Sequence, residues 1–210
     1  MTLFAVMAIM AVFAIALLAV APSVQQEIQR EKELEAIARG EEVAEAIRQY
    51  VIFYRGSKLP NSMDDLLEGL PQGTKKRMIL RASAAIDPLS EDGKWRLIKA
   101  DTSTLGPFAR RVQNYNGGVL PANPSPIFDR WSGQLVNSLN VDLDSDNDAD
   151  DFEVVTENQP FIGVASQDKG KSVIAYYGVE NHSKWVFTPL FRGVGRTGPV
   201  RPITTTQIVQ

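Results

Sequence analysis

The chain has 210 residues, with 22 Lys plus Arg against 25 Asp plus Glu and a formal net charge of −3. This length favours one domain with at most an added segment, and this charge argues against a nucleic-acid-binding protein. The chain also has no cysteine and one histidine, His182, which excludes disulfide scaffolds, cysteine nucleophiles, thiolate zinc sites and histidine-rich metal centres.

The N-terminal segment is apolar. From Leu3 to Ala21 there is no charged side chain over 19 residues, and a helix of that length covers about 28 Å, close to the thickness of a bilayer core. Only Met1 and Thr2 precede the run, without the basic residues that begin a secretory signal. We therefore expect a mature chain whose basic leader has been removed.

A helical pattern continues beyond this run, because apolar residues recur three or four positions apart. They are Val24, Ile28, Leu34, Ile37, Val43, Ile47, Val51 and Tyr54. Charged residues from Glu27 to Arg48 lie between them and include two favourable pairs, Glu35–Arg39 and Glu45–Arg48. The pattern predicts one helix of roughly 54 residues, about 80 Å long, with an apolar first half and an amphipathic second half.

Three residues predict where this helix is weak or ends. Pro22 lacks a backbone N–H and is expected to loosen or kink the helix. Gly40 is expected to be a weak point inside it. Gly56 is expected to terminate it.

Residues 57–210 are long enough for a small globular head. Ser62 is expected to cap a short helix over 62–68, and further helices are expected over 75–85, 108–115 and 127–139. Apolar side chains of the last helix are expected to face the core: Phe128, Trp131, Leu135 and Leu139. The tail from Arg192 onward is rich in Gly, Pro and Thr, and the alternatives for it are a flexible terminus and an extended arm laid across a neighbouring subunit.

Strand signals lie in four short segments, 95–98, 161–165, 172–177 and 184–189, which are β-branched or aromatic and bounded by turn residues. Gly178 and Asn181 are expected to form a turn before the last of them. Short polar connections favour antiparallel pairing. We expect one apolar face of the sheet to pack on the amphipathic half of the long helix.

The acidic run 141–153 is the one stretch that resembles a metal site. Its oxygen donors fall at positions 1, 3, 5, 7, 9 and 12 of a twelve-residue calcium loop, and these donors are Asp142, Asp144, Asp146, Asp148, Asp150 and Glu153. Asn147 occupies the sixth position, which is normally Gly. The alternatives are a Ca²⁺ site and a solvated acidic loop.

No catalytic motif stands out. The chain has no nucleophile elbow, phosphate-binding loop or dinucleotide-binding glycine pattern. His182 lies between two strand signals and is expected to be an exposed turn residue. We therefore expect that the protein is not an enzyme.

Several motifs resemble the type IV pilin and type II secretion pseudopilin family. The resemblance begins with Met1-Thr2-Leu3 opening an apolar helix with a proline at position 22. It continues where the helix ends, at Tyr50, Tyr54, Gly56, Leu59, Pro60, Ser62, Asp65, Leu66 and Leu67. Residues 87–99 look like the family's Asp-Pro turn before its sheet, and residues 161–189 are similar to the C-terminal region of some acidobacterial pseudopilin-like proteins.

The resemblance implies an α+β pilin fold. Its parts would be a long helix over 1–55 with a membrane or filament-core segment over 1–24, an antiparallel-sheet head over 56–191, and an extended tail over 192–210. It also implies a structural Ca²⁺ in the head and an N-methylated Met1. Ala5 stands where the family has a glutamate that helps recruit subunits, so major and minor subunits both remain open, and we favour a major one.

The function implied is that of a structural subunit of a helical filament, either a type IV pilus-like filament or a type II secretion pseudopilus. Its partners would be further copies of itself, a prepilin peptidase and an inner-membrane assembly platform. The chain would be stored in the inner membrane and then assembled at the cell surface or in the periplasm. The alternatives are a minor or tip pseudopilin and a single-span anchor that carries a periplasmic binding head.

Overall fold

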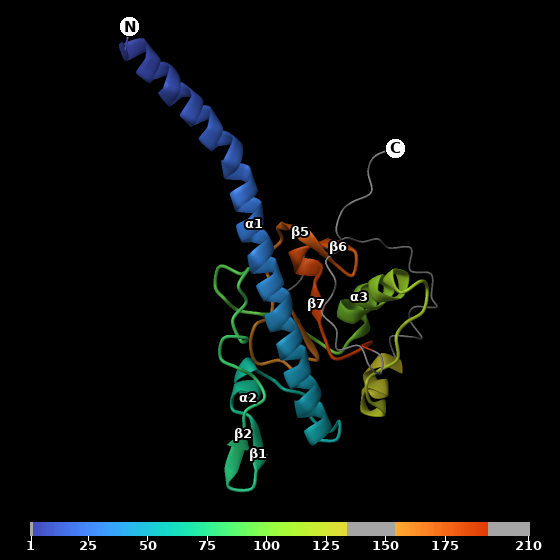
Figure 1. Ribbon diagram of the computed structural model, residues 1–210. Coiled ribbons are helices and arrows are strands. Elements are labelled where there is room, and N and C mark those ends of the chain that lie inside the picture. The colour runs from blue at the N-terminus through green and yellow to red at the C-terminus, as the bar shows by residue number, and fades with distance from the viewer. Residues whose placement is uncertain (1, 134–153, 193–210) are drawn as a thin grey trace.

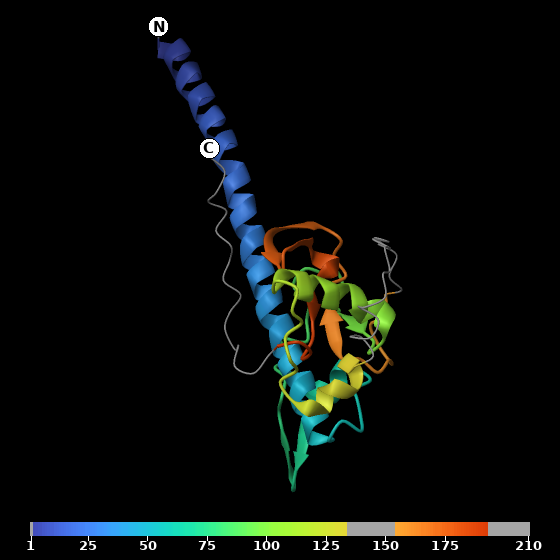
Figure 2. The same ribbon diagram turned by 90° about the vertical axis from the view of Figure 1, so that its right-hand side faces the viewer.

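One long helix, α1, organises the chain in the computed structural model (Figure 1). The structure describes residues 2–133 and 154–192, with the side chains of all these residues except 2 and 14–23. α1 spans Thr2–Phe53, 52 residues, so the prediction of a single long N-terminal helix is confirmed. Its first part stands clear of the head, its second part lies along the head, and it changes direction between the two (Figures 1 and 2). The helix is continuous through Pro22.

The helix ends where the sequence predicts. Arg55 and Gly56 have φ of 52° and 74°, and the Gly56 N–H donates to the Val51 carbonyl over 2.9 Å. A left-handed residue with this backward hydrogen bond is a common helix terminator. Gly56 therefore has the predicted role.

Three small antiparallel sheets and several short helices form the head. The helical elements are α2 (Met63–Leu67), α3 (Thr102–Tyr115) and the 3₁₀ turns η1 (Pro126–Phe128) and η2 (His182–Lys184). The strands are β1 (Leu70–Gln72), β2 (Lys75–Arg77), β3 (Arg96–Ile98), β4 (Gly163–Ala165), β5 (Lys171–Tyr176), β6 (Val179–Asn181) and β7 (Val186–Phe187). Among the described residues they form the sheets β1-β2, β3-β4-β7 and β5-β6. The α+β class and the antiparallel pairing are confirmed.

Two predicted helices in the head are confirmed at least in part. Ser62 caps α2 by accepting a hydrogen bond from the Asp65 N–H. α3 contains the predicted helix over 108–115 but begins at Thr102, because the Asp101 carboxylate accepts from the Thr104 N–H over 2.8 Å. This capping interaction extends the helix by two turns at its N-terminal end.

The predicted helix over 75–85 is wrong. Lys75–Arg77 pairs with Leu70–Gln72 as a hairpin, and Gly73 in the connection has φ of 63°. A positive-φ glycine between two short runs favours a tight turn over a helix. After Arg77 the chain is irregular up to Trp95.

Other predicted elements are shorter than expected or lie only partly in the described residues. After η1, residues 129–133 are helical, and the rest of the predicted helix over 127–139 lies outside the described part. Phe128 is fully buried and Trp131 packs against the core, as predicted for both. Val179–Asn181 forms a strand where the sequence analysis expected a turn.

The core lies between α1 and the sheets. Strands β4, β5 and β7 contact α1, as predicted for an apolar face of the sheet. Five large aromatic side chains are fully buried there, namely Trp95, Trp185, Phe128, Phe161 and Phe187. Burying one large apolar side chain stabilises a fold by about 1.5–3 kcal/mol, so this layer fixes the head on the second half of the helix.

Gly40 is not a weak point of the helix. A Cβ at this position would lie 2.3 Å from Cδ2 of the Phe187 ring. The absent side chain lets β7 approach the backbone of α1 closely. The sequence analysis considered only the helix propensity of Gly40 and missed this tertiary contact.

Candidate functional site

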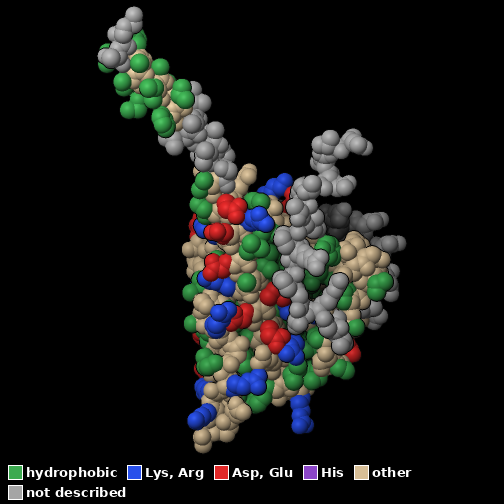
Figure 3. Space-filling model, viewed as in Figure 1, with side chains coloured by type: hydrophobic (Ala, Val, Ile, Leu, Met, Phe, Trp, Pro, Cys, Tyr) green, Lys and Arg blue, Asp and Glu red, His purple; other side chains and the backbone are tan. Residues whose placement is uncertain are grey.

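The first part of α1 exposes a continuous apolar surface. Eight large side chains of residues 3–13 are between 54 % and 79 % exposed: Leu3, Phe4, Val6, Met7, Ile9, Met10, Val12 and Phe13. We call this segment the arm. Figure 3 shows its hydrophobic side chains clear of the head, whereas the visible face of α1 beside the head carries mixed acidic and basic side chains.

The apolar surface of α1 continues beside the head. Val24, Ile28 and Leu34 are 51 %, 50 % and 42 % exposed, although the sequence pattern placed them in one stripe with the core residues Val43 and Ile47. The stripe is therefore buried in its C-terminal half only. Groups of exposed apolar residues larger than single side chains mark protein or membrane contacts.

Among the helices of the described residues, none is both long enough and apolar enough to cross a membrane.

The predicted assembly residues fall at different places. Ala5 lies in the arm and is exposed. Pro22 lies in α1, and Met1 is outside the described residues. The predicted calcium ligands Asp142, Asp144, Asp146, Asp148, Asp150 and Glu153 also lie outside the described residues.

Among the residues described, no group of three acidic or histidine side chains is placed to hold a metal ion. Ca²⁺ binding by 142–153 stays a prediction. Calorimetric titration of the full chain checks it, and the absence of heat with millimolar Ca²⁺ would count against it.

Glu33 joins α1 to the β5–β6 hairpin. It is fully buried, and its carboxylate accepts hydrogen bonds from the backbone N–H groups of Val173 and Ile174 at 2.8–3.0 Å. Gln29 donates to the same carboxylate over 2.9 Å and to the Lys171 carbonyl. A buried carboxylate is tolerated only when such donors replace water, and these donors come mostly from the head.

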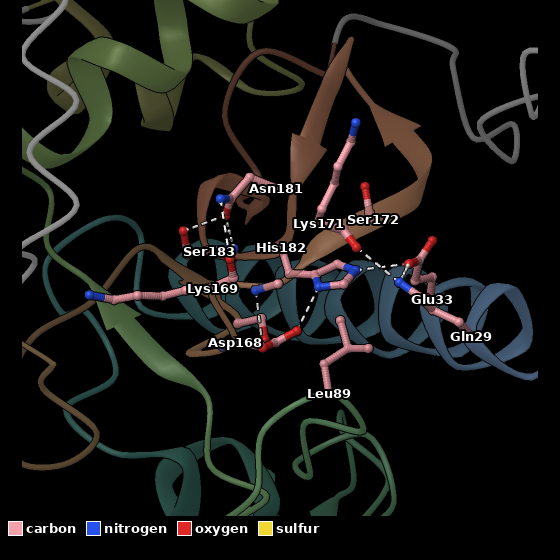
Figure 4. A network of polar contacts seen from close by, with 12 residues as sticks. Gln29, Glu33, Leu89, Asp168, Lys169, Lys171, Ser172, Asn181, His182 and Ser183 are labelled. Carbon is pink, nitrogen blue, oxygen red and sulfur yellow. Dashed lines mark hydrogen bonds and ion pairs between the residues drawn. The ribbon is translucent and has the colours of Figure 1, made fainter. Parts of the chain in front are cut away.

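His182 is buried, so the prediction of an exposed turn residue is wrong. Its ring is 3 % exposed and lies between two carboxylates (Figure 4). Nε2 is 2.9 Å from Oε1 of Glu33, and Nδ1 is 2.6 Å from Oδ2 of Asp168. The ring edge also packs on Trp185, with centroids 5.0 Å apart. Folding of η2 against α1 buries a residue that local sequence places in a turn.

The geometry around His182 holds the ring in place. Both ring nitrogens face carboxylate oxygens rather than a hydroxyl that the ring could activate. This arrangement links α1, the 166–170 segment and η2. That the protein is not an enzyme stays a prediction.

A second, partly buried contact lies about two turns further along α1. The Tyr176 hydroxyl donates to Oε1 of Glu41 over 2.6 Å, and Arg192 forms an ion pair with Oε2 of Glu41 over 2.5 Å. Burial and the neighbouring Glu41 carboxylate raise the pKa of the Tyr176 phenol well above its usual value, so Tyr176 stays a neutral donor.

Many charges of α1 contact the chain's own head. Glu42 pairs with Arg81, whose hydrogen bonds lower the pKa of the Glu42 carboxyl, and Arg39 donates to the Ile86 carbonyl over 3.0 Å. The predicted pairs within the helix, Glu35–Arg39 and Glu45–Arg48, are confirmed.

An open hollow of about 360 Å³ lies where α1 meets the head near His182. Its lining residues are Gln25, Ile28, Gln29, Lys32, Pro88, Leu89, Asp168 and His182. Solvent in this hollow has direct access to Asp168, whose side chain is 35 % exposed. The hollow therefore connects the buried ring to water.

Sequence reasoning missed Glu33, Asp168 and Tyr176 as contacts. For Glu33 a signal existed, since residues 33, 36, 40, 43 and 47 recur at helical spacing and all are buried. Asp168 and Tyr176 carried no such signal, because their partners lie more than ten residues away in sequence.

Comparison with known proteins gives no match: no protein-family model, no curated protein and no solved structure is similar to this chain at a significant level. The chain's own residues therefore carry the functional argument.

Proposed function

We propose that the protein is a structural subunit that assembles into a helical filament through the apolar first half of α1. The exposed arm carries this proposal. Eight large apolar side chains in water are strongly unfavourable, and they face all sides of the helix, so one neighbouring surface cannot cover them. A bundle of helices from several copies, or a bilayer, would cover them all.

The exposed apolar residues of α1 beside the head favour a filament over a simple anchor. Val24, Ile28 and Leu34 continue the apolar surface into the part of α1 that lies beside the head. An anchor needs apolar residues only within the bilayer, whereas bundled copies also need them beside the head. The proposed filament is a type IV pilus-like filament or a type II secretion pseudopilus, by the resemblance noted above.

The wider proposal follows from the same resemblance. The chain would wait in the inner membrane as a single-pass protein, after cleavage by a prepilin peptidase and N-methylation of Met1. An assembly platform would then add it to a filament at the cell surface or in the periplasm. Bundled helices would exchange lipid contacts for protein contacts, so extraction from the bilayer is energetically feasible.

Electron microscopy of the sheared surface fraction, with mass spectrometry of its subunits, tests this proposal. Filaments made of this chain would support a major subunit. Filaments without it, with the chain left in the membrane fraction, would contradict the major-subunit proposal and favour a minor pseudopilin or an anchored head.

Paired variants sharpen the test. Replacing both Val24 and Leu34 by Ser removes apolar surface beside the head and leaves the arm intact, so we expect fewer filaments with unchanged membrane association. Val119→Ser is the matched control, because Val119 is an exposed apolar residue on a loop of the head, far from α1 in sequence. Equal filament yields from the two variants would contradict a role of the exposed apolar residues beside the head in assembly.

A further inference from the structure

The Glu33 carboxylate is surrounded by hydrogen-bond donors. Oε1 and Oε2 accept hydrogen bonds from Gln29, Val173 and Ile174. These neighbours are all N–H donors, and a carboxylate that only accepts suits all of them. In that arrangement Nε2 of His182, 2.9 Å from Oε1, donates to Glu33.

The other ring nitrogen, Nδ1, also faces a carboxylate oxygen. Nδ1 lies 2.6 Å from Oδ2 of Asp168, and Oδ1 of Asp168 accepts from the Gly170 N–H over 3.1 Å. A neutral imidazole carries one N–H only. With a neutral ring and an ionised Asp168, two lone pairs would face each other across the shorter of the two contacts.

We propose that protonation of His182 closes a clasp between α1 and the head. In the closed form the imidazolium donates to Glu33 on α1 and to Asp168 on the segment before β5. Loss of one proton leaves the Asp168 contact unmade while the Glu33 contact is kept, so the segment before β5 and η2 are held to each other less firmly. The clasp makes the stability of this part of the head, which places His182 against α1, depend on pH.

The groups around the clasp carry both signs. On α1, Lys32 lines the hollow beside the ring, Lys169 lies within the 168–170 turn, and Lys171, which pairs with Glu180, follows it. These cations oppose the charge of an imidazolium, whereas the carboxylates of Glu33 and Asp168, at 2.9 and 2.6 Å, favour it. The Ser166 hydroxyl accepts from the Asp168 N–H and donates to Asp87 over 2.7 Å, so a second carboxyl is linked to the cluster. Lys184 lies at the end of η2. The hollow gives Asp168 and the ring a path for proton exchange with water.

The direction of the pH effect follows from linkage. The closed clasp binds a proton that the unfolded chain holds only below about pH 6.5, the usual titration of a free histidine. Its stabilisation is therefore complete below that pH and is lost as the pH rises. Because the chain has one histidine and no cysteine, His182 and the terminal amine are the groups that ordinarily titrate between pH 6 and 8.5.

Urea unfolding of the full chain in detergent micelles, followed by tryptophan fluorescence, tests the clasp. We expect the unfolding constant of the wild type to rise on the order of tenfold between pH 6 and pH 8.5. Asp168→Asn should abolish this rise, because its amide N–H can donate to Nδ1 of a neutral ring while its oxygen accepts from Gly170. Equal pH dependence in the wild type and Asp168→Asn would overturn the proposal.

A control variant and an NMR measurement distinguish the clasp from other causes of a pH-dependent unfolding constant. Glu180→Gln alters an exposed ion pair on the same hairpin and should keep the wild-type pH dependence. If Asp168→Asn does not fold, nitrogen NMR of the ring in the wild type decides the matter, since a single histidine gives an unambiguous signal. Two protonated ring nitrogens at pH 7 are expected, and one unprotonated nitrogen would overturn the clasp.

Discussion

At the scale of single residues, buried polar side chains decide how the head sits on α1. Hydrophobic contact alone allows a helix to slide or rotate by small amounts on a sheet, whereas buried hydrogen bonds allow one arrangement. Glu33 supplies a fully buried contact of this kind, and Glu41 supplies a partly buried one two turns further along the helix. The hydrogen-bond partners of each carboxylate lie in the C-terminal part of the head, more than 130 positions later in sequence.

Removing the Glu33 carboxylate should destabilise the fold strongly. Glu33→Ala leaves the buried N–H of Ile174 and the partly buried N–H of Val173 without their acceptor, and a buried loss of this kind costs about 1–3 kcal/mol. We expect the free energy of unfolding to fall by about 3 kcal/mol in urea denaturation. Glu31→Ala is the control, because Glu31 is exposed on the same helix, and a similar loss in both variants would refute this role of Glu33.

The shifted pKa of Asp87 predicts how the stability of the fold changes with pH. Burial raises the pKa of its carboxyl, against hydrogen bonds from Leu89 and Ser166 that act in the opposite direction. The folded chain therefore binds this proton more tightly than the unfolded chain, and the contribution of Asp87 to stability falls as the pH rises through its folded pKa.

Asp87→Asn removes this titration with little change of shape. We expect the variant to gain stability relative to the wild type as the pH rises from 4 to 7, measured by urea denaturation at each pH. Asp129→Asn, whose carboxylate makes an exposed hydrogen bond with Asn123, serves as control. If the difference in free energy of unfolding between Asp87→Asn and the wild type did not change with pH, burial of the Asp87 charge would have no net effect on stability.

At the scale of elements, the contact between α1 and β7 depends on Gly40. Alanine at this position would raise helix propensity by about 1 kcal/mol, but its Cβ would overlap the buried Phe187 ring. Overpacking in a core costs about 1–3 kcal/mol. We therefore expect Gly40→Ala to lower the melting temperature.

Gly106 in α3 is the matched control for Gly40. It is also buried within a helix, but beyond its chain neighbours a Cβ there would meet only Thr102 Cγ2 at 3.9 Å, an ordinary contact. The following Pro107 disfavours the helical conformation of a residue that has a Cβ, which offsets the gain in helix propensity. Gly106→Ala should therefore change stability less than Gly40→Ala does. Stabilisation by both substitutions would show that β7 moves away from α1 without cost.

The elements with local signals could be predicted from sequence, and those that depend on distant partners could not. The end of α1 at Gly56 and the Ser62 cap are set by residues within one turn, and both are confirmed. The buried His182 depends on Glu33, 149 positions away in sequence. The 75–77 strand is an exception, because its partner Leu70–Gln72 is adjacent and the Gly73 turn between them is a local signal that was missed. The apolar periodicity of α1 correctly predicted a helix. Before residue 36, however, it placed Leu34 on the buried face, whereas the buried residue there is its neighbour Glu33.

At the scale of the whole molecule, the two halves of α1 differ in what covers them. The second half packs against the chain's own head, whereas no described residue covers the arm. This division lets the head fold in each single chain and leaves the arm exposed. In the filament proposed above, each subunit would therefore fold before it polymerises.

Cross-linking distinguishes bundled copies from separate anchors, and the absence of native cysteine makes each introduced thiol unique. A chain with Ile9→Cys and Val24→Cys carries one thiol on the arm and one beside the head, about 22 Å apart along the helix, so a short bis-maleimide cannot join them within one chain. If copies bundle through α1, treatment of the assembled fraction should give dimers and higher species. Ile9→Cys with Val119→Cys should give fewer, because Val119 lies outside α1, and equal yields from the two pairs would favour independent anchors that meet by chance.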